Sequence, residues 1–233
     1  MCGRFTRKEN FQHLAELLGL KVVPPLRPRY NIAPSQLVAC VRTNPESGQR
    51  ECTELKWGLV PSWAKDPSIG NKLINARGET VAEKPAFRKA FKQQRCLVLV
   101  DGFYEWKQEG KAKQPYYVRF KDQRLFAFAG LWERWEKHEA DPLETFTLIT
   151  TAPNTVMEPI HHRMPVILTS KDYADWLDPS LQAIERVNAL LRPFPPEEME
   201  AYPVSQLVNN PRNDGPECVI TIQGGDKSGR SGL

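Results

Sequence analysis

Short apolar segments separated by polar turns run along most of the chain. The run Cys96-Leu97-Val98-Leu99-Val100 is apolar throughout, which predicts a strand that is buried on both faces. Segments 103–107 and 114–120 alternate on either side of a turn around Gly110, which predicts a β-hairpin. Further strands are expected at residues 37–42, 53–60, 125–130, 146–151, 166–168 and 218–222.

Fewer segments have the period of a helix. Residues 6–18 carry a capping box at Thr6 and Glu9, apolar residues on one face, and Gly19 as a stop signal. Other helices are expected at residues 84–95, after Ser170, and at residues 181–191. Strands outnumber helices and do not alternate with them, so the pattern predicts a single α+β domain with a largely antiparallel β-sheet core and flanking helices.

Length and charge narrow the class of protein. The chain has 233 residues and a net charge of +4, which suits one large or two small domains and permits contact with nucleic acid without demanding it. It contains no apolar run long enough to span a membrane and no secretory signal peptide. We therefore expect an intracellular protein with no membrane contact, cytoplasmic and nucleoid-associated if the source is bacterial.

The cysteines do not form a disulfide or zinc pattern. There are five, at positions 2, 40, 52, 96 and 218, and no C-x-x-C pair occurs. Cys96 and Cys218 adjoin apolar residues and are expected to be buried. We expect no metal site and no cofactor.

Cys2 is the residue with the most distinctive chemistry. A small residue behind the initiator favours removal of Met1, which would leave an N-terminal Cys2 with a free α-amine and a thiol. Their ordinary pKa values, ~7.7–8.0 and ~8.5, leave part of each nucleophilic near neutral pH. Such a terminus can attack an aldehyde through the amine and close a thiazolidine ring through sulfur, or act as a thiol nucleophile with the amine as base. The alternative is a small residue at a frayed terminus.

Three other stretches concentrate polar residues that core packing does not explain. They are Asn75-Ala76-Arg77, the segment 101–106 with Glu105 among aromatic residues, and the segment 160–165, which Thr150 precedes. Taken singly, each also has a structural interpretation. Glu105 is either a strand residue that faces water or a partly desolvated acid with a raised pKa. His161 and His162 are adjacent, so they are expected to point in different directions.

Taken together, these stretches resemble the SOS response-associated peptidase family, whose members are also called abasic site processing proteins. The resemblance runs in order from residue 1 to about residue 220 and rests on Met1-Cys2-Gly3-Arg4-Phe5, Tyr30-Asn31-Ile32-Ala33-Pro34, Trp57-Gly58-Leu59-Val60-Pro61-Ser62-Trp63, Ile74-Asn75-Ala76-Arg77, Asp101-Gly102-Phe103-Tyr104-Glu105-Trp106-Lys107 and His161-His162-Arg163-Met164-Pro165. It implies that residues 1–222 form the family domain, and residues 223–233 are expected to be a disordered tail.

The resemblance implies a sensor and shield for abasic sites in single-stranded DNA, acting in the DNA damage response. Cys2 would form a covalent thiazolidine crosslink with the ring-opened sugar aldehyde. Glu105 would move protons on the amine and the carbinolamine, and His161 would protonate the sugar oxygen. Asn75 would hold the sugar hydroxyl or the adjacent phosphate in reacting geometry. Lyase activity and autoproteolytic, cysteine peptidase-type activity are further implications.

The family pattern also implies a DNA-contacting set. Arg4, Arg77 and Arg163 match basic positions that would clamp the flanking phosphates. Trp63 matches an aromatic residue that would stack on a base beside the lesion, and Thr150 matches a hydroxyl that lines the pocket. The chain departs from the pattern at Ala64 and Pro85, which puts in doubt its grip on the neighbouring base or duplex.

The expected partner is single-stranded DNA with abasic sites, bound by a monomer, with replication-fork proteins as further candidates. Three alternatives use the same residues differently. An N-terminal-nucleophile glutaminase would attack a glutamine amide through Cys2, and a cysteine peptidase would use Cys2, Glu105 and His161. A passive single-stranded DNA binder would need only the basic and aromatic residues.

Overall fold

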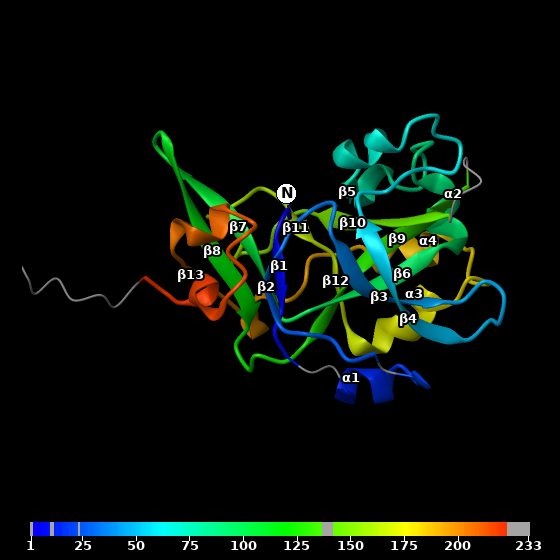
Figure 1. Cartoon of the computed structure of the whole chain (residues 1–233), viewed down its shortest axis with the longest axis horizontal. Helices are drawn as coiled ribbons and strands as arrows, with labels where there is room; N and C mark the ends of the chain where they lie inside the picture. The colour runs from blue at the N-terminus through cyan, green and yellow to red at the C-terminus, as the bar shows by residue number, and fades with distance from the viewer. Residues whose placement is uncertain (1, 10–11, 23, 137–141, 223–233) are drawn as a thin grey trace, which may run out of the picture.

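Two β-sheets form the centre of the molecule (Figure 1), a computed structural model that describes residues 2–9, 12–22, 24–136 and 142–222. The first sheet has the order β13-β8-β7-β1-β2, and every pairing within it is antiparallel. Its strands are β1 (Phe5–Arg7), β2 (Arg29–Ile32), β7 (Gly102–Glu109), β8 (Ala112–Phe120) and β13 (Met199–Pro203). The hairpin predicted around Gly110 is therefore confirmed as β7 and β8.

The second sheet has the order β11-β10-β4-β3-β6-β9-β12, with β5 added beside β10. In the described residues, a further pairing of β9 with β10 closes strands β10, β4, β3, β6 and β9 into a ring. Among the described strands, the only parallel pairings are those of β10 with β4 and with β5, so the prediction of a largely antiparallel α+β fold is confirmed. The strands are β3 (Leu37–Thr43), β4 (Arg50–Trp57), β5 (Asn75–Arg77), β6 (Arg95–Val100), β9 (Phe126–Trp135), β10 (Leu143–Thr151), β11 (Met164–Pro165) and β12 (Ile167–Leu168).

The helices are short and lie around this framework. The α-helices are α1 (Gln12–Leu17), α2 (Arg88–Gln93), α3 (Tyr173–Leu177) and α4 (Ile184–Asn188). The 3₁₀ helices are η1 (Pro67–Lys72), η2 (Gly78–Thr80), η3 (Ser170–Asp172), η4 (Pro196–Glu198), η5 (Gln206–Asn209) and η6 (Pro216–Val219). No helix in the described ranges is long and apolar enough to cross a membrane.

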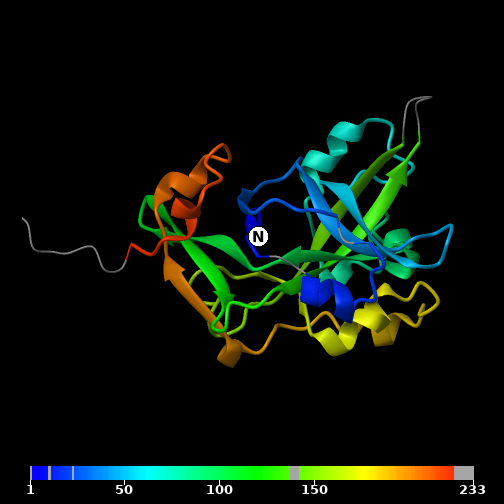
Figure 2. The same cartoon turned by 60° about the horizontal axis from the view of Figure 1, so that its bottom comes forward.

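Strand β6 separates the two main parts of the core. Cys96, Val98 and Val100 join the cluster that lies between the sheets, where side chains of both sheets meet. Leu97 and Leu99 point the other way, into a cluster shared with α1, α2 and α3. Successive strand residues face opposite sides of a sheet, so an all-apolar run can fill both layers. The predicted double burial of this segment is confirmed. Figure 2 shows the N-terminal strand at the junction of the two sheets.

The helix predicted from residue 6 begins later than expected. Thr6 lies in β1 and its hydroxyl bonds to the carboxylate of Asp101, while the backbone N–H of Glu9 donates to the same carboxylate at 2.9 Å. Asp101 thus takes the place of the expected capping box, and α1 begins at Gln12. The apolar face of the helix is nevertheless buried at Leu14 and Leu18, as predicted.

The strand predicted at residues 218–222 is also wrong. Cys218 lies in η6, which Pro216 begins with a φ angle suited to a helical turn. Thr221 alone forms an isolated bridge, to Val204. The tail predicted at residues 223–233 lies outside the described residues.

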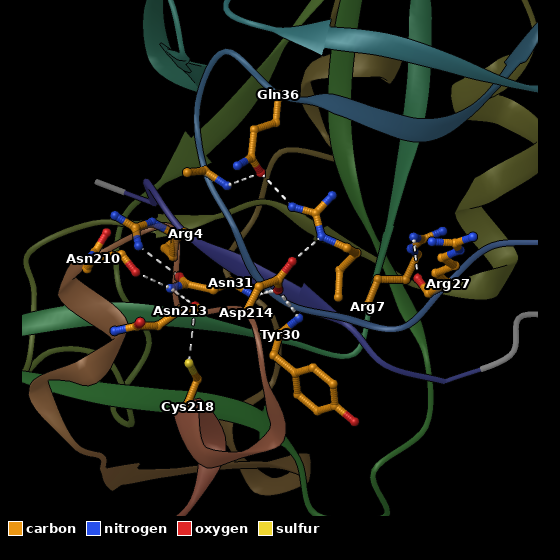
Figure 3. Close-up of polar contacts among 12 residues, drawn as sticks. Arg4, Arg7, Arg27, Tyr30, Asn31, Gln36, Asn210, Asn213, Asp214 and Cys218 are labelled. Atoms are coloured by element: carbon orange, nitrogen blue, oxygen red, sulfur yellow. Dashed lines mark hydrogen bonds and ion pairs between the residues drawn. The ribbon is translucent and has the colours of Figure 1, made fainter.

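Residues 204–222, here called the C-terminal segment, are held against the β1–β2 edge of the first sheet (Figure 3). The carboxylate of Asp214 accepts the backbone N–H groups of Tyr30 (2.6 Å) and Asn31 (2.7 Å) and pairs with Arg29. The buried amide nitrogen of Asn31 lies within hydrogen-bond distance of three carbonyls of the segment, those of Val208, Asn210 and Asn213. Asn31 and Asp214 therefore join the two parts of the chain.

Replacing Asn31 with alanine is expected to lower the free energy of unfolding by about 2–4 kcal/mol, because it removes the donor that three carbonyls of the C-terminal segment share and the side-chain acceptor of Arg4. Urea unfolding followed by tryptophan fluorescence measures the loss. Asn188→Ala, at an exposed position on α4, is the matched control and should change stability by less than about 0.5 kcal/mol. Equal stability of the two variants would contradict the role given to Asn31.

Candidate active site

The pairing of β1 with β7 places Cys2 beside Glu105. Phe5 lies opposite Phe103, and the N–H of Tyr104 donates to the carbonyl of Arg4 at 3.0 Å, so the next residues of the two strands continue side by side. Cys2 is buried, and its thiol points to the Arg4 carbonyl at 3.8 Å. Burial, reinforced by the negative charge of Glu105, raises the pKa of the Cys2 thiol well above its usual range.

Strand β5 supplies the residue that fixes the position of Cys2. The side-chain N–H of Asn75 donates to the Cys2 carbonyl at 2.8 Å. The amide oxygen of Asn75 is buried and has no hydrogen-bond partner in the described part of the chain. The side-chain nitrogen of Asn75 therefore fixes the position of Cys2, and its side-chain oxygen remains an acceptor beside Cys2.

Glu105 is 2% exposed, and burial raises the pKa of its carboxyl to about 7. A carboxyl group with this pKa is present in both protonation states at neutral pH. It can therefore take up and return a proton within a single reaction cycle.

His161 lies in the loop between β10 and β11. Its Nδ1 lies 3.0 Å from the backbone nitrogen of Arg163 and 3.2 Å from the carbonyl oxygen of the same residue, so Arg163 fixes the orientation of the ring. Burial lowers the pKa of His161 to about 4, and the nearby positive charge of Lys113 contributes to the shift. The ring stacks on His162 with a centroid separation of 4.4 Å, so the two histidines do not diverge as expected.

His161 and Glu105 both line a cavity of about 370 Å³, together with Trp106, Lys113 and Asn209. The indole N–H of Trp106 donates to the side-chain oxygen of Asn209 at 2.8 Å, which holds the ring in place. Sequence analysis did not propose Trp106, Lys113 or Asn209 as site residues. Trp106 could have been found because it directly follows Glu105, and Lys113 because the predicted hairpin pairs it with Gln108, close to Glu105. Asn209 lies about a hundred residues away and has no such signal.

Arg163 and Thr150 lie together at the next edge of the site. The guanidinium of Arg163 pairs with both carboxylate oxygens of Glu79 and donates to the Thr150 carbonyl at 2.6 Å. Thr150 is buried, and its hydroxyl donates to the Ala76 carbonyl at 3.2 Å. Arg77, at the end of β5, is in register with Thr150 and is exposed. Its side chain is therefore accessible to a phosphate group.

The guanidinium of Arg4, expected to bind a DNA phosphate, is already hydrogen-bonded to acceptors of the protein. Its Nη1 donates to the Asn31 side chain at 2.8 Å and to the Val208 carbonyl at 2.6 Å, and the guanidinium lies 5.8 Å from the Trp106 ring centre. Arg4 thus links the C-terminal segment to the cavity wall.

Trp63 lies on a loop between β4 and η1 and is 55% exposed. Its indole N–H donates to the Pro85 carbonyl at 3.4 Å. The base of the loop is closed by Gly58 and Gly70, where a Cβ on Gly58 would lie 2.7 Å from the Gly70 carbonyl oxygen. The ring is accessible for stacking, but it is not part of the wall of the cavity that holds Glu105 and His161.

Within the described ranges, no group of three or more His, Cys, Asp or Glu side chains is arranged to hold a metal ion. The polar groups of the site are the thiol, amide, carboxyl and imidazole described above. Their chemistry is that of proton transfer and nucleophilic attack.

Comparisons with known proteins give a consistent result. Residues 1–211 match the family described as SOS response associated peptidase (SRAP). The abasic site processing protein YoqW of Bacillus subtilis is 47% identical over 94% of this chain and 99% of its own. The abasic site processing protein HMCES of Gallus gallus is 36% identical over 84% of this chain and 67% of its own. The crystal structure of a Bacteroides thetaiotaomicron protein superposes with a TM-score of 0.83, at 30% identity, over 94% of this chain and 99% of that one.

Proposed function

The chain belongs to the SOS response-associated peptidase family, and from this membership we propose that it processes abasic sites in single-stranded DNA through a covalent reaction at Cys2. The observation that carries the proposal is the convergence of four side chains at the start of the chain. Asn75 binds the Cys2 carbonyl, Glu105 lies beside Cys2, and His161 shares a cavity with Glu105.

The reaction begins after removal of Met1. The α-amine of Cys2 adds to the aldehyde carbon of the ring-opened sugar, and the carbinolamine loses one water to give an imine. The sulfur then bonds to the imine carbon, its proton passes to the imine nitrogen, and a thiazolidine ring results. The product keeps every atom of protein and DNA except one water. Ring closure removes the imine that would otherwise promote strand cleavage by β-elimination, so lyase activity is a side reaction of the open imine.

Each of the other groups has a part in this sequence. Glu105 takes protons from the attacking amine and returns them to the departing hydroxyl group. His161, in its protonated form, donates a proton to the sugar oxygen during ring opening and is left as the neutral imidazole. The buried oxygen of Asn75 accepts a hydrogen bond from a sugar hydroxyl. Arg77 and Trp63 are exposed and would contact the DNA beside the lesion, whereas Arg4, Arg163 and Thr150 bind groups of the protein that border the site.

The pKa directions favour attack by the amine over attack by the thiol. A cysteine peptidase needs a thiolate, usually stabilised by a histidine cation. Here burial raises the pKa of the Cys2 thiol and lowers that of His161 to about 4, so both groups are neutral at pH 7. The same directions disfavour autoproteolytic release of Met1 by the Cys2 thiol, and association with replication-fork proteins is a further part of the proposal. The acting species is a monomer.

The test uses untagged protein and a single-stranded oligonucleotide with one abasic site. A denaturing gel should show a shifted band that survives heating, and its intact mass should equal protein without Met1 plus DNA minus one water. Borohydride should not be needed to preserve it. A protein that begins at Cys2 and gives no shifted band would overturn the proposal and favour the peptidase or glutaminase alternatives.

A further inference from the structure

Lys113 contributes the one formally cationic side chain to the wall of the cavity that holds Glu105 and His161, within the residues that the structure describes. It lies on β8, two residues beyond Lys111 at the hairpin turn, and is exposed. The other wall residues are a carboxyl group with a pKa of about 7, an imidazole with a pKa of about 4, an indole and an amide. Lys113 therefore supplies the positive charge among the wall residues.

Lys113 differs from the neighbouring cations in its contacts. Arg163 pairs with Glu79, and Arg4 donates to Asn31 and Val208, so both bind acceptors of the protein. Lys107, on the paired strand, has Glu109 at 3.8 Å. Across the described ranges, no carboxylate forms an ion pair with Lys113. Its charge is near enough to His161 to affect that ring. A cation in this setting can bind an external anion without breaking a bond within the protein.

The size of the cavity limits what that anion can be. A volume of about 370 Å³ is near the lower end of the range for small-molecule sites, which suits a sugar with one attached phosphate better than a stacked base. The walls bring together a group that titrates near neutral pH, a neutral imidazole and a cation, which fits a sugar that reacts deep in the cavity while its phosphate stays at the mouth.

We propose that Lys113 is a phosphate-binding residue that contacts one of the two phosphates flanking the abasic sugar. The contact would fix the sugar over Glu105 and His161. It would also neutralise one of the positive charges that act on His161, which favours protonation of the ring when DNA is bound. The inference rests on the proposed function for the identity of the sugar, whereas the phosphate contact itself can be measured without any covalent reaction.

The experiment measures equilibrium binding of an oligonucleotide that carries a tetrahydrofuran abasic analogue, which has no aldehyde and cannot be crosslinked. Lys113→Met should weaken binding about tenfold and reduce the slope of log K against log salt by about 0.7, the value for one phosphate contact on a single strand. Lys111→Met, which removes the same charge two residues away, should change affinity less than twofold. Lys113→Arg should restore most of the binding.

Oligonucleotides with one uncharged methylphosphonate locate the contact. A methylphosphonate at one of the two flanking positions should weaken DNA binding by the wild-type protein about as much as Lys113→Met does. The same oligonucleotide should cause no further loss of affinity in the Lys113→Met variant. The inference would be overturned if Lys111→Met and Lys113→Met lost the same affinity. It would also be overturned if, at both phosphates, the loss caused by the methylphosphonate added to the loss caused by Lys113→Met. If wild type captures an aldehyde oligonucleotide while Lys113→Met binds normally, the inference fails and the proposed function stands. If wild type does not capture the aldehyde oligonucleotide but the methylphosphonate and Lys113→Met losses do not add, the phosphate site stands and the crosslinking function does not.

Discussion

Cys2→Ala is expected to abolish heat-stable capture of an abasic oligonucleotide, at least a thousandfold below wild type, while binding of the same DNA stays within about threefold. Alanine at the chain end keeps an α-amine, so it can form an imine, but it has no sulfur to close the ring. The imine should be visible only after borohydride trapping. A denaturing gel with and without borohydride, together with salt-dependent binding, measures both results.

Two controls distinguish the role of the Cys2 α-amine in capture from that of a cysteine thiol. Cys52→Ala removes a half-buried cysteine far along the chain and should leave capture unchanged. An uncleavable extension before Cys2 keeps the sulfur but converts the amine into an amide, and it should prevent capture as completely as Cys2→Ala. Normal capture by the extended protein would show that the α-amine is not the nucleophile.

Glu105→Gln is expected to slow capture by a factor of about 10² to 10⁴, the usual range for loss of a general acid or base. With wild type, the rate should rise as pH passes through about 7, where the Glu105 carboxyl loses its proton. In the variant this inflection should disappear, which leaves the titration of the α-amine near ~8. Single-turnover rates between pH 5.5 and 9 measure the difference.

The same substitution should change how stability depends on pH. Burial favours the neutral carboxyl group in the folded state, so its contribution is fully present below the unfolded pKa of about 4.5 and is lost as pH rises through about 7. Glu105→Gln stays neutral throughout. Its stability relative to wild type should therefore increase by a few kcal/mol, on the order of 3, between pH 4.5 and pH 8. Glu109→Gln, an exposed residue of the same strand, should show no such trend. A parallel pH dependence of wild type and Glu105→Gln would contradict the assignment.

Local pattern was enough to predict much of the fold. The run 96–100 is apolar on both faces because β6 lies between two core layers, and the hairpin at Gly110 follows from two alternating segments and a turn. For the site, motif identity singled out Cys2, Asn75, Glu105 and His161. The structure brings them to one place through the β1–β7 register and the packing of β5 beside β10. Their catalytic roles remain predictions.

What sequence could not provide depends on contacts between distant residues. Asp101 displaces the expected capping box because a strand partner brings its carboxylate to the start of the chain. Asn209 reaches the cavity from the C-terminal segment, and Arg4 is bound by residues far from it in sequence. A basic residue in a motif looks the same whether it will bind phosphate or a protein carbonyl. Only the geometry shows that Arg4 binds a carbonyl of the protein.

The hydrogen bond between Asn31 and Asp214 also determines when, during translation, the N-terminal strands can acquire their contacts with the C-terminal segment. The two residues are 183 positions apart, so at about 5–20 residues per second the ribosome makes the second roughly 10 to 40 seconds after the first. During that interval the nascent N-terminus lacks the segment that fixes Arg4 and supplies Asn209 to the cavity. The N-terminus is thus synthesised first and acquires its contacts with the C-terminal segment last, which favours assembly of the candidate site only in chains whose translation has proceeded past Asp214.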